Sequence, residues 1–427
     1  MDDNVQILPP CKKVKLENDL DYSVSSASIY GEHSKKSESA VSIKRSDDNR
    51  NHLKNESNVL IPEERPLKKL CKQSQSAVSI RNKDIASCET RNEYLNTEKE
   101  LERDDSNYFK CYADLSIHRV MIGDYSRTQT YRRAILNNYK LFHQKVVLDV
   151  GAGTGILSLF CAQAGARKVY AVEASPIAQQ ARKVIESNGF TEKIIVIQGK
   201  VEEVDLPEKV DIIVSEWMGY MLMYESMLPS FLFARDKWLR KDGYLFPEEV
   251  KIYIAPISDS QEYEYSVEFW NKVEDAYKID MSVLVPTAEE QLQASVHVMS
   301  VDPASIMSHA SCVTAIDLAT LEREFSQCAK GSFSCSSFGS ATIYGFAIWF
   351  TVHFPNNVVL STSPYERETH WEQSVLYITP IDVVQDTVIS GNLWIERGEV
   401  YHRFLDIELE YQIDNGEKQK LKYKMKD

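Results

Sequence analysis

Two glutamates nine positions apart are the strongest chemical signal in this 427-residue sequence. Glu216 and Glu225 lie in the segment 215–228, whose other residues are mostly Trp, Met, Tyr and Leu. An unpaired carboxylate is expensive to bury in such apolar company, whereas a planar guanidinium pairs with carboxylates through two parallel hydrogen bonds. The pattern therefore predicts a site that binds a guanidinium between two carboxylates. Two surface glutamates on a loop are the alternative.

A glycine-rich turn follows the apolar segment 146–150. Its spacing is Gly-x-Gly-x-Gly, preceded by one acidic residue: Asp149, Gly151, Gly153 and Gly155. Glycines after a buried strand let a ligand approach the backbone closely. The dinucleotide fingerprint has its third glycine one residue later and serves a pyrophosphate, so this spacing favours S-adenosylmethionine. A tight strand–helix turn without a ligand is the alternative.

Two further carboxylates follow predicted strands. Glu173 comes directly after the segment 168–172, where a carboxylate accepts hydrogen bonds from both ribose hydroxyls of a nucleoside. S-adenosylmethionine and NAD both predict this residue, so it does not separate them. Glu202 follows the apolar segment 194–198, where the adenine of the same ligand would lie.

The elements that position these residues form two patterns. Apolar strands alternate with helices up to Phe246-Pro247, which predicts a parallel sheet buried on both faces. After Pro247 the segments are β-like, which predicts an antiparallel barrel or sandwich. A helical insertion at 261–283 interrupts this second part. We expect strands at 146–150, 168–172, 194–198 and 210–215, helices at 156–165 and 176–188, and later strands at 251–254, 341–354, 374–378 and 404–413.

The composition of residues 1–104 differs from that of the rest of the chain. Residues 1–104 are poor in aromatic residues and rich in Ser, Asn, Lys and Glu, which predicts a disordered tail. Within it, the basic cluster at 10–17 resembles a nuclear import signal; a chance cluster is the alternative.

The net charge of −14 falls almost wholly after residue 104, which disfavours direct binding to nucleic acid and favours basic partners. No Cys-x-x-Cys pair and no apolar run of about 18 residues occur, so neither a metal site nor a membrane span is predicted.

These blocks, in this order and spacing, resemble the type I protein arginine N-methyltransferases from about Tyr108 to the C-terminus. The segment 215–228 and the loop Thr369-His370-Trp371 carry the resemblance, and the segments 345–350 and 361–364 are similar to a nuclear member of that family. The resemblance implies an α/β fold: a Rossmann-like class I S-adenosylmethionine methyltransferase domain at 105–247, then an antiparallel β-barrel substrate domain at 248–427. A helical dimerisation arm would lie at about 261–283. The sequence departs from the family at Lys278, where the family has glycine.

The resemblance also implies an activity. Methyl groups would pass from S-adenosyl-L-methionine to guanidino nitrogens of arginines in proteins, histone tails among them, giving mono- and asymmetric dimethylarginine. Met121 and Met227 match two family methionines that leave room for the asymmetric product. A homodimer, a nuclear location and a role in transcription and chromatin regulation follow from the same resemblance. An NAD-dependent oxidoreductase and an inactive scaffold of this fold are the rival hypotheses; the glycine spacing disfavours the first, and the intact glutamates disfavour the second.

Residue by residue, the resemblance assigns three groups of side chains. The catalytic group would clamp the guanidinium, with the histidine acting either as a base or as a scaffold residue: Glu216, Glu225 and His370. Cofactor-binding residues would include Arg127, which would pair with the cofactor's methionine carboxylate, together with His118, Asp149, Gly151, Gly153, Gly155, Glu173 and Glu202. The substrate space would be shaped by Tyr108, Tyr112, Met121, Asp124, Met227 and Trp371.

Overall fold

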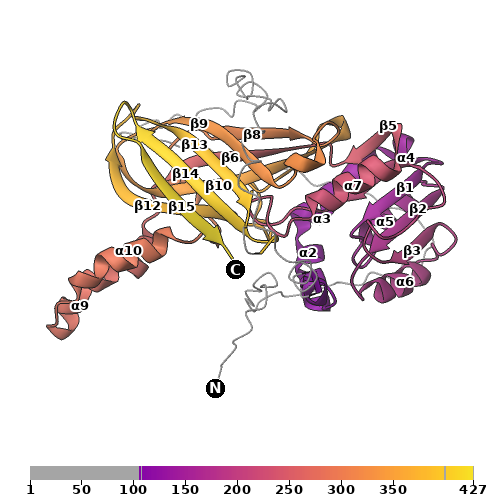
Figure 1. Ribbon diagram of the computed structural model, residues 1–427, viewed down its shortest axis with the longest axis horizontal. Helices are drawn as coiled ribbons and strands as arrows, with labels where there is room; N and C mark the ends of the chain where they lie inside the picture. Colours follow the sequence, from indigo (N-terminus) through magenta and orange to yellow (C-terminus); the bar gives the residue numbers. More distant parts are fainter. Residues whose placement is uncertain (1–104, 107, 399–400, 427) are drawn as a thin grey trace, which may run out of the picture. The chain divides into compact units, whose positions relative to one another are not determined.

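A five-stranded parallel sheet forms the first half of the described chain (Figure 1). The computed structural model describes residues 105–106, 108–398 and 401–426, so the predicted tail and its basic cluster lie outside it. The strand order is β3-β2-β1-β4-β5, and every neighbouring pair is parallel. The strands are β1 (Val146–Val150), β2 (Lys168–Glu173), β3 (Ile194–Gln198), β4 (Val210–Ser215) and β5 (Leu239–Phe246).

The apolar runs explain why this sheet forms. β1 is buried at every position, and five of the six residues of β2 are buried, as expected for central strands covered on both faces. The connecting helices are α5 (Ile156–Gln163), α6 (Ala178–Ser187) and α7 (Leu228–Trp238). The predicted strands and helices of this half are confirmed to within about two residues at their ends, whereas α7 and β5 were not predicted.

Three helices of the described chain precede β1, and residues of the first two line the cavity at the carboxyl ends of the strands. They are α2 (Leu115–Gly123), α3 (Tyr125–Asn137) and α4 (Tyr139–Phe142), preceded by a helical turn at 108–111. Asp114 caps α2 and Asp124 caps α3, each by accepting a hydrogen bond from a backbone N–H of the first turn. The buried Tyr131 hydroxyl donates to the carbonyl of Ser215 at 2.9 Å, which fixes α3 to the end of β4.

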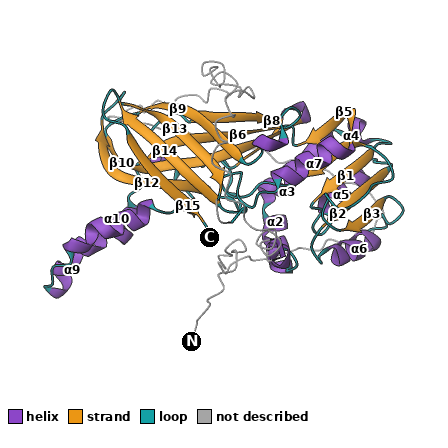
Figure 2. Ribbon diagram, viewed as in Figure 1, coloured by secondary structure: helices purple, strands orange, loops and turns teal. Residues whose placement is uncertain are grey.

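The second half consists of two antiparallel sheets that share a core (Figure 2). The six-stranded sheet has the order β7-β12-β10-β6-β8, with β11 added to β10, and the four-stranded sheet has the order β15-β14-β13-β9. Bridges between Ser295 and Lys424 and between Ser308 and Ser337 join the sheets at both seams, giving the predicted barrel. The strands are β6 (Glu249–Ile257), β7 (His297–Met299), β8 (Ser311–Asp317), β9 (Cys328–Ser336), β10 (Ala341–Phe354), β11 (Val358–Ser361), β12 (Gln373–Val383), β13 (Val388–Arg397), β14 (Leu405–Ile413) and β15 (Gln419–Met425).

A helical arm interrupts the barrel between β6 and β7 and projects away from its strands (Figure 1). It comprises α8 (Gln261–Tyr263), a π-helix (Glu264–Glu268), α9 (Phe269–Tyr277), a 3-10 turn (Ser282–Leu284) and α10 (Val285–Gln293). Tyr265 and Tyr277 are 79% and 73% exposed, whereas Tyr263 is buried with its ring 5.4 Å from that of Tyr344. Within the described chain no helix is long and apolar enough to cross a bilayer.

Candidate active site

A cavity of about 430 Å³ lies at the carboxyl ends of the parallel strands. Its floor is formed by residues that follow β1, β2, β3 and β4, including the reversal of strand order between β1 and β4 where open α/β sheets bind ligands. The N-terminal helical segment and the 402–403 segment of the barrel close it. Most of the predicted residues meet in this one cavity: Tyr108, Tyr112, His118, Met121, Arg127, Gly151, Gly153, Glu173, Glu202, Glu216, Glu225 and Met227.

The glycine turn leaves backbone exposed to this cavity. Gly151 and Gly153 have φ of +72° and +55°, the left-handed region that side chains rarely adopt. A Cβ on Gly151 would lie 2.4 Å from Cε of Met227, and one on Gly153 would lie 3.2 Å from Cε1 of His118. Gly155 caps α5 and does not line the cavity. The first two glycines therefore allow a ligand to approach the backbone closely, and the third allows the chain to turn into α5.

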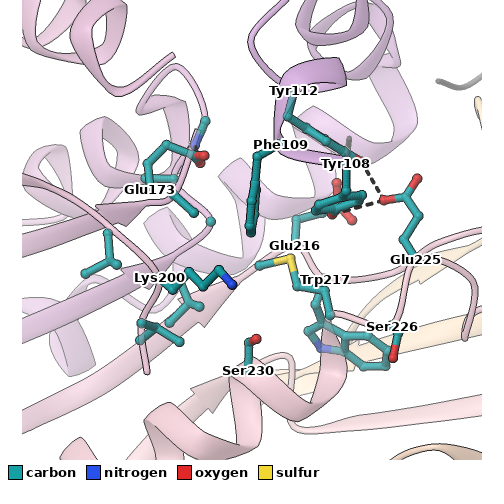
Figure 3. Close-up of a pocket in the computed structure, with 18 of the residues that line it drawn as sticks. Tyr108, Phe109, Tyr112, Glu173, Lys200, Glu216, Trp217, Glu225, Ser226 and Ser230 are labelled. Carbon is teal, nitrogen blue, oxygen red and sulfur yellow. Dashed lines mark hydrogen bonds between the residues drawn. The ribbon is translucent and has the colours of Figure 1, made fainter. Parts of the chain in front are cut away.

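Glu173 presents an oriented carboxylate at the end of β2 (Figure 3). Its Oε2 accepts the N–H of Gly153 at 2.8 Å and its Oε1 accepts the N–H of Ser175 at 2.7 Å. Further along the wall, Oε1 of Glu202 accepts the Ser230 hydroxyl at 2.6 Å. Both carboxylates are held in one orientation, and each has lone pairs left for a ligand.

Asp149 lies behind the cavity wall rather than on it. The residue is fully buried, and its Oδ2 accepts the Ser158 hydroxyl at 2.6 Å. Burial, together with the charge of Glu173, raises the pKa of Asp149 to about 7 despite the Ser158 hydrogen bond, which lowers it. Asp149, which the resemblance assigns to cofactor binding, therefore lies beneath the glycine turn and not on the cavity wall.

Arg127 and Glu216 form a buried ion pair on the cavity wall. Nε and Nη2 of Arg127 lie 2.8 Å and 2.7 Å from Oε2 of Glu216, and Nη1 donates to the carbonyl of Met121 at 3.1 Å. The structure pairs Arg127 with Glu216, because a buried guanidinium needs a nearby anion. The contact of Arg127 with a cofactor carboxylate, which the resemblance implies, stays a prediction. The pair fixes the orientation of the Glu216 carboxylate.

Glu225 reaches the cavity from a strained loop. Its φ is +73° and that of Ser226 is +54°, conformations that cost non-glycine residues free energy and that cluster at functional sites. The hydroxyls of Tyr108 and Tyr112 donate to its Oε2 at 3.3 Å and 2.6 Å (Figure 3). Burial and the Glu225 charge raise the pKa of both tyrosines well above 10, so both remain neutral donors.

His370, Asp124 and Trp371 lie next to the cavity without lining it. Nδ1 of His370 is 2.7 Å from Oδ2 of Asp124, and its ring centroid is 4.1 Å from that of Trp371. The indole N–H of Trp371 donates to the carbonyl of Met218 at 3.1 Å. The predicted pairing of His370 with Asp124 is present, in a position that supports α3 and the loop after β4.

Several cavity residues were missed by sequence reasoning: Asp105, Lys200, Arg397, His402 and Arg403. Asp105 and Arg403 form an ion pair across 298 positions of the chain. No local sequence pattern predicts such a pair, because neither residue belongs to a recognisable motif. Only the fold brings them together. In the described chain no cluster of three or more His, Cys, Asp or Glu is arranged to hold a metal ion.

Comparison with known proteins agrees with this geometry. Residues 248–417 match the family model "Arginine methyltransferase oligomerization subdomain", and residues 128–230 match "Ribosomal protein L11 methyltransferase". The Danio rerio "Protein arginine N-methyltransferase 6" is 45% identical over 342 residues, covering 78% of this chain and 98% of that relative. The Xenopus laevis protein of the same name is 46% identical, covering 74% of this chain and 94% of that relative.

A solved structure shares both halves of the fold. The Trypanosoma brucei PRMT1 enzyme–prozyme heterotetrameric complex with AdoHcy superposes with a TM-score of 0.68 at 34% identity. The match covers 74% of this chain and 99% of that one. With the two glutamates, the glycine turn and the barrel in place, the chain belongs to the protein arginine N-methyltransferase family.

Proposed function

We propose that this protein arginine N-methyltransferase takes methyl groups from S-adenosyl-L-methionine and converts arginines of basic protein segments, such as histone tails, to mono- and asymmetric dimethylarginine. The observation that carries the proposal is the meeting of Glu216 and Glu225 in one cavity with Glu173 and the glycine turn. Two carboxylates suit a guanidinium, and the turn with its ribose-type carboxylate suits an adenosyl ligand.

The cofactor side of the cavity fits S-adenosylmethionine. Gly151 and Gly153 line the cavity with backbone alone, the fixed carboxylate of Glu173 would accept the ribose hydroxyls, and Glu202 would lie beside the adenine. His118 and Arg127 line the remaining side. When bound, the cofactor supplies an electrophilic methyl group on a sulfonium.

The substrate side works by orientation. A guanidinium has a pKa above about 12 and a delocalised lone pair, so it needs positioning more than a strong base. Glu216 and Glu225 would bind its two Nη groups and localise the positive charge on one nitrogen, which leaves the lone pair of the other available. Arg127 and the two tyrosines hold these carboxylates in place.

Met121 and Met227 support the asymmetric product. Both line the cavity, and a flexible thioether adapts its shape to an already methylated nitrogen. A second methyl group on the same nitrogen then has room. A homodimer built through the arm is part of the same proposal, and so is a role in chromatin and transcription regulation.

The reaction is tested with a histone H4 tail peptide and S-adenosylmethionine, with the products read by mass spectrometry. We expect wild-type protein to give mono- and asymmetric dimethylarginine, distinguished from the symmetric isomer by neutral loss. Glu216→Gln and Glu225→Gln should each abolish transfer while calorimetry shows unchanged binding of S-adenosylhomocysteine. Glu208→Gln, at a surface ion pair with Arg167, is the control. An inactive wild-type protein would favour the scaffold hypothesis, and a symmetric product would refute the assigned specificity.

Nuclear location is tested separately, because the basic cluster lies outside the described residues. Residues 1–20 fused to a fluorescent reporter should concentrate in nuclei, and replacement of Lys12, Lys13 and Lys15 by Ala should release the fusion. A diffuse signal from the unmutated fusion would refute import by this segment.

A further inference from the structure

One barrel residue makes both backbone contacts of Glu225. The carbonyl of Arg403 accepts the N–H of Glu225 at 3.0 Å, and Nη1 of Arg403 donates to the carbonyl of Glu225 at 2.6 Å. Glu225 has φ of +73°, which an L-residue holds only when its surroundings impose it. Arg403, 178 positions further along the chain, provides those surroundings.

The same guanidinium also holds the N-terminal segment. Its Cζ lies 3.8 Å from the ring centroid of Tyr108, and Nη2 pairs with Oδ1 of Asp105. Tyr108 in turn donates its hydroxyl to the Glu225 carboxylate. Arg403 therefore touches the backbone of Glu225 on one side and, on the other, one of the tyrosines that hold its side chain.

Asp105 forms ion pairs with several residues next to this contact. Besides Arg403 it pairs with Lys200 at 2.6 Å and with Nε2 of His402 at 3.3 Å. Burial raises the pKa of Asp105, but the His402 hydrogen bond and the Arg403 charge outweigh it and hold that pKa well below its usual range. Asp105 thus stays ionised throughout the neutral range and ties the helical turn at 108–111 to both domains.

We infer that Arg403 is a positioning residue for methyl transfer: it sets the Glu225 backbone, and through Tyr108 and Asp105 it holds the N-terminal segment on the Glu225 carboxylate. The inference rests on the proposed role of Glu225 as a guanidinium ligand. It makes the barrel a contributor to the geometry of the active site.

The chemistry of the contact requires arginine. A guanidinium is planar and has five N–H donors, so it can stack on Tyr108 while donating in two directions. A lysine ammonium keeps the positive charge next to Asp105, but it has no planar group to stack on Tyr108 and no rigid set of N–H donors. Arg403→Lys therefore removes the stacking on Tyr108 and the paired hydrogen bonds while it preserves the positive charge.

Arg235 offers a matched control. Its side chain is 12% exposed, as is that of Arg403, and it likewise pairs with an aspartate, Asp236. Its Nη1 donates to the carbonyl of Leu318 at 2.7 Å, a link from α7 to the barrel, and it does not line the cavity. Arg235→Lys thus reports what the loss of a comparable buried arginine does to stability alone.

The experiment compares the full-length Arg403→Lys and Arg235→Lys proteins. We expect Arg403→Lys to lower kcat for the peptide by about 10- to 100-fold, since a displacement of about 1 Å costs that much. Its melting temperature and its Kd for S-adenosylhomocysteine should match those of Arg235→Lys. Equal kcat in the two variants would overturn the inference, and so would a loss of kcat fully explained by lost cofactor binding.

Asp105→Asn tests the second half of the contact. It should also lower kcat, and the double variant with Arg403→Lys should lie within about threefold of Arg403→Lys alone, because coupled residues are not additive. Multiplicative losses would show that Asp105 does not act through Arg403. Glu225→Gln separates the two hypotheses: if it is active, the proposed function fails, and if it is inactive while Arg403→Lys is fully active, only this inference fails.

Discussion

Nδ1 of His370 lies 2.7 Å from Oδ2 of Asp124, so a barrel residue supports the N-terminus of the helix that carries Arg127. The other carboxylate oxygen of Asp124 accepts the N–H of Arg127 at 2.9 Å and caps α3. Burial raises the pKa of Asp124, but the His370 hydrogen bond and the Arg127 N–H outweigh it, and the net shift is downward. Through this pair the barrel fixes the residue that orients Glu216.

We predict that His370→Gln lowers kcat without changing the acidic limb of its pH profile. A glutamine amide still donates to Asp124 but lacks the imidazole ring that packs on Trp371, so a loss of about 10-fold is expected from looser positioning. The measurement is kcat for a histone peptide between pH 6 and 9. Disappearance of the acidic limb in His370→Gln would show that His370 is the general base.

Glu173→Gln should weaken cofactor binding. The amide keeps one acceptor oxygen but loses the charge, and a hydrogen bond to a charged group contributes roughly 1.5–3 kcal/mol, so Kd should rise by about one to two decades. Calorimetry with S-adenosylhomocysteine measures the effect. Glu186→Gln, on the exposed face of α6, is the control, and an unchanged Kd in Glu173→Gln would remove the ribose assignment.

Asp149 should make stability fall as pH rises. Its pKa is about 7 in the folded chain against 3.8 for an unperturbed aspartate, so between these values the native state holds a proton that the unfolded state has released. Since the native state binds more protons there, the free energy of unfolding decreases from about pH 4 to pH 7, in total by on the order of 4 kcal/mol, and is flat above.

Asp149→Asn removes that dependence, because an amide does not titrate. Urea unfolding at pH 5 and pH 8 should show wild-type protein losing more stability than Asp149→Asn over this interval. Asp236→Asn, at a half-exposed site, should follow wild type. Parallel losses in all three proteins would contradict the buried, proton-holding state of Asp149.

The sequence sufficed for four of the five strands of the parallel sheet, β1 to β4, because each is mostly apolar. β3 and β4 begin and end where the apolar segments do. β5 (Leu239–Phe246) escaped prediction, because only its last two residues are buried and its centre reads Arg-Lys-Asp-Gly. A strand at the edge of a sheet needs no apolar run, so periodicity does not reveal it.

The site was predictable where chemistry and motif coincide. Glu173 ends β2 and Glu216 directly follows β4, so strand order brings both to one edge, whereas Glu225 lies on the loop after β4 and is held there by Arg403. The pairing of Arg127 with Glu216 depends on how α3 packs on the end of β4, and the contacts of Arg403 depend on how the two domains pack. No local pattern encodes either. In the arm, Tyr263 is buried because it packs on the barrel through Tyr344, a long-range contact that residue type does not reveal.

Lys278→Gly should stabilise the arm. Lys278 ends α9 in the left-handed conformation, with φ of +57° and ψ of +34°, which favours glycine at this helix position. Relief of backbone strain, less the extra flexibility of glycine when unfolded, should add roughly 0.5–1 kcal/mol. Thermal unfolding measures the gain. Lys272→Gly, inside the same helix, should lower stability by about 1 kcal/mol, and a loss in both variants would contradict the strain.

The last prediction concerns assembly through the arm. Tyr265, Phe269 and Tyr277 are 79%, 49% and 73% exposed, and such exposed apolar groups on a projecting element mark an interface. The arm lies within the region that matches the oligomerization subdomain. We predict that replacing these three residues by Ser converts a homodimer into a monomer, as measured by light scattering. Tyr139→Ser and Tyr244→Ser, two exposed tyrosines outside the arm, should remain dimeric.

The monomer should also bind S-adenosylhomocysteine weakly. In a two-fold dimer the arm of one subunit would dock on the cofactor domain of the other and would order the helical segment that carries Tyr112 and Arg127. Calorimetry on the triple variant should therefore give a raised Kd, and transfer to the histone peptide should slow in parallel. Because Tyr263 keeps the base of the arm packed on the barrel, the monomer should retain its fold by circular dichroism. A folded, fully active monomer would mean that catalysis does not depend on the dimer, and a dimer that survives the three substitutions would place the interface elsewhere.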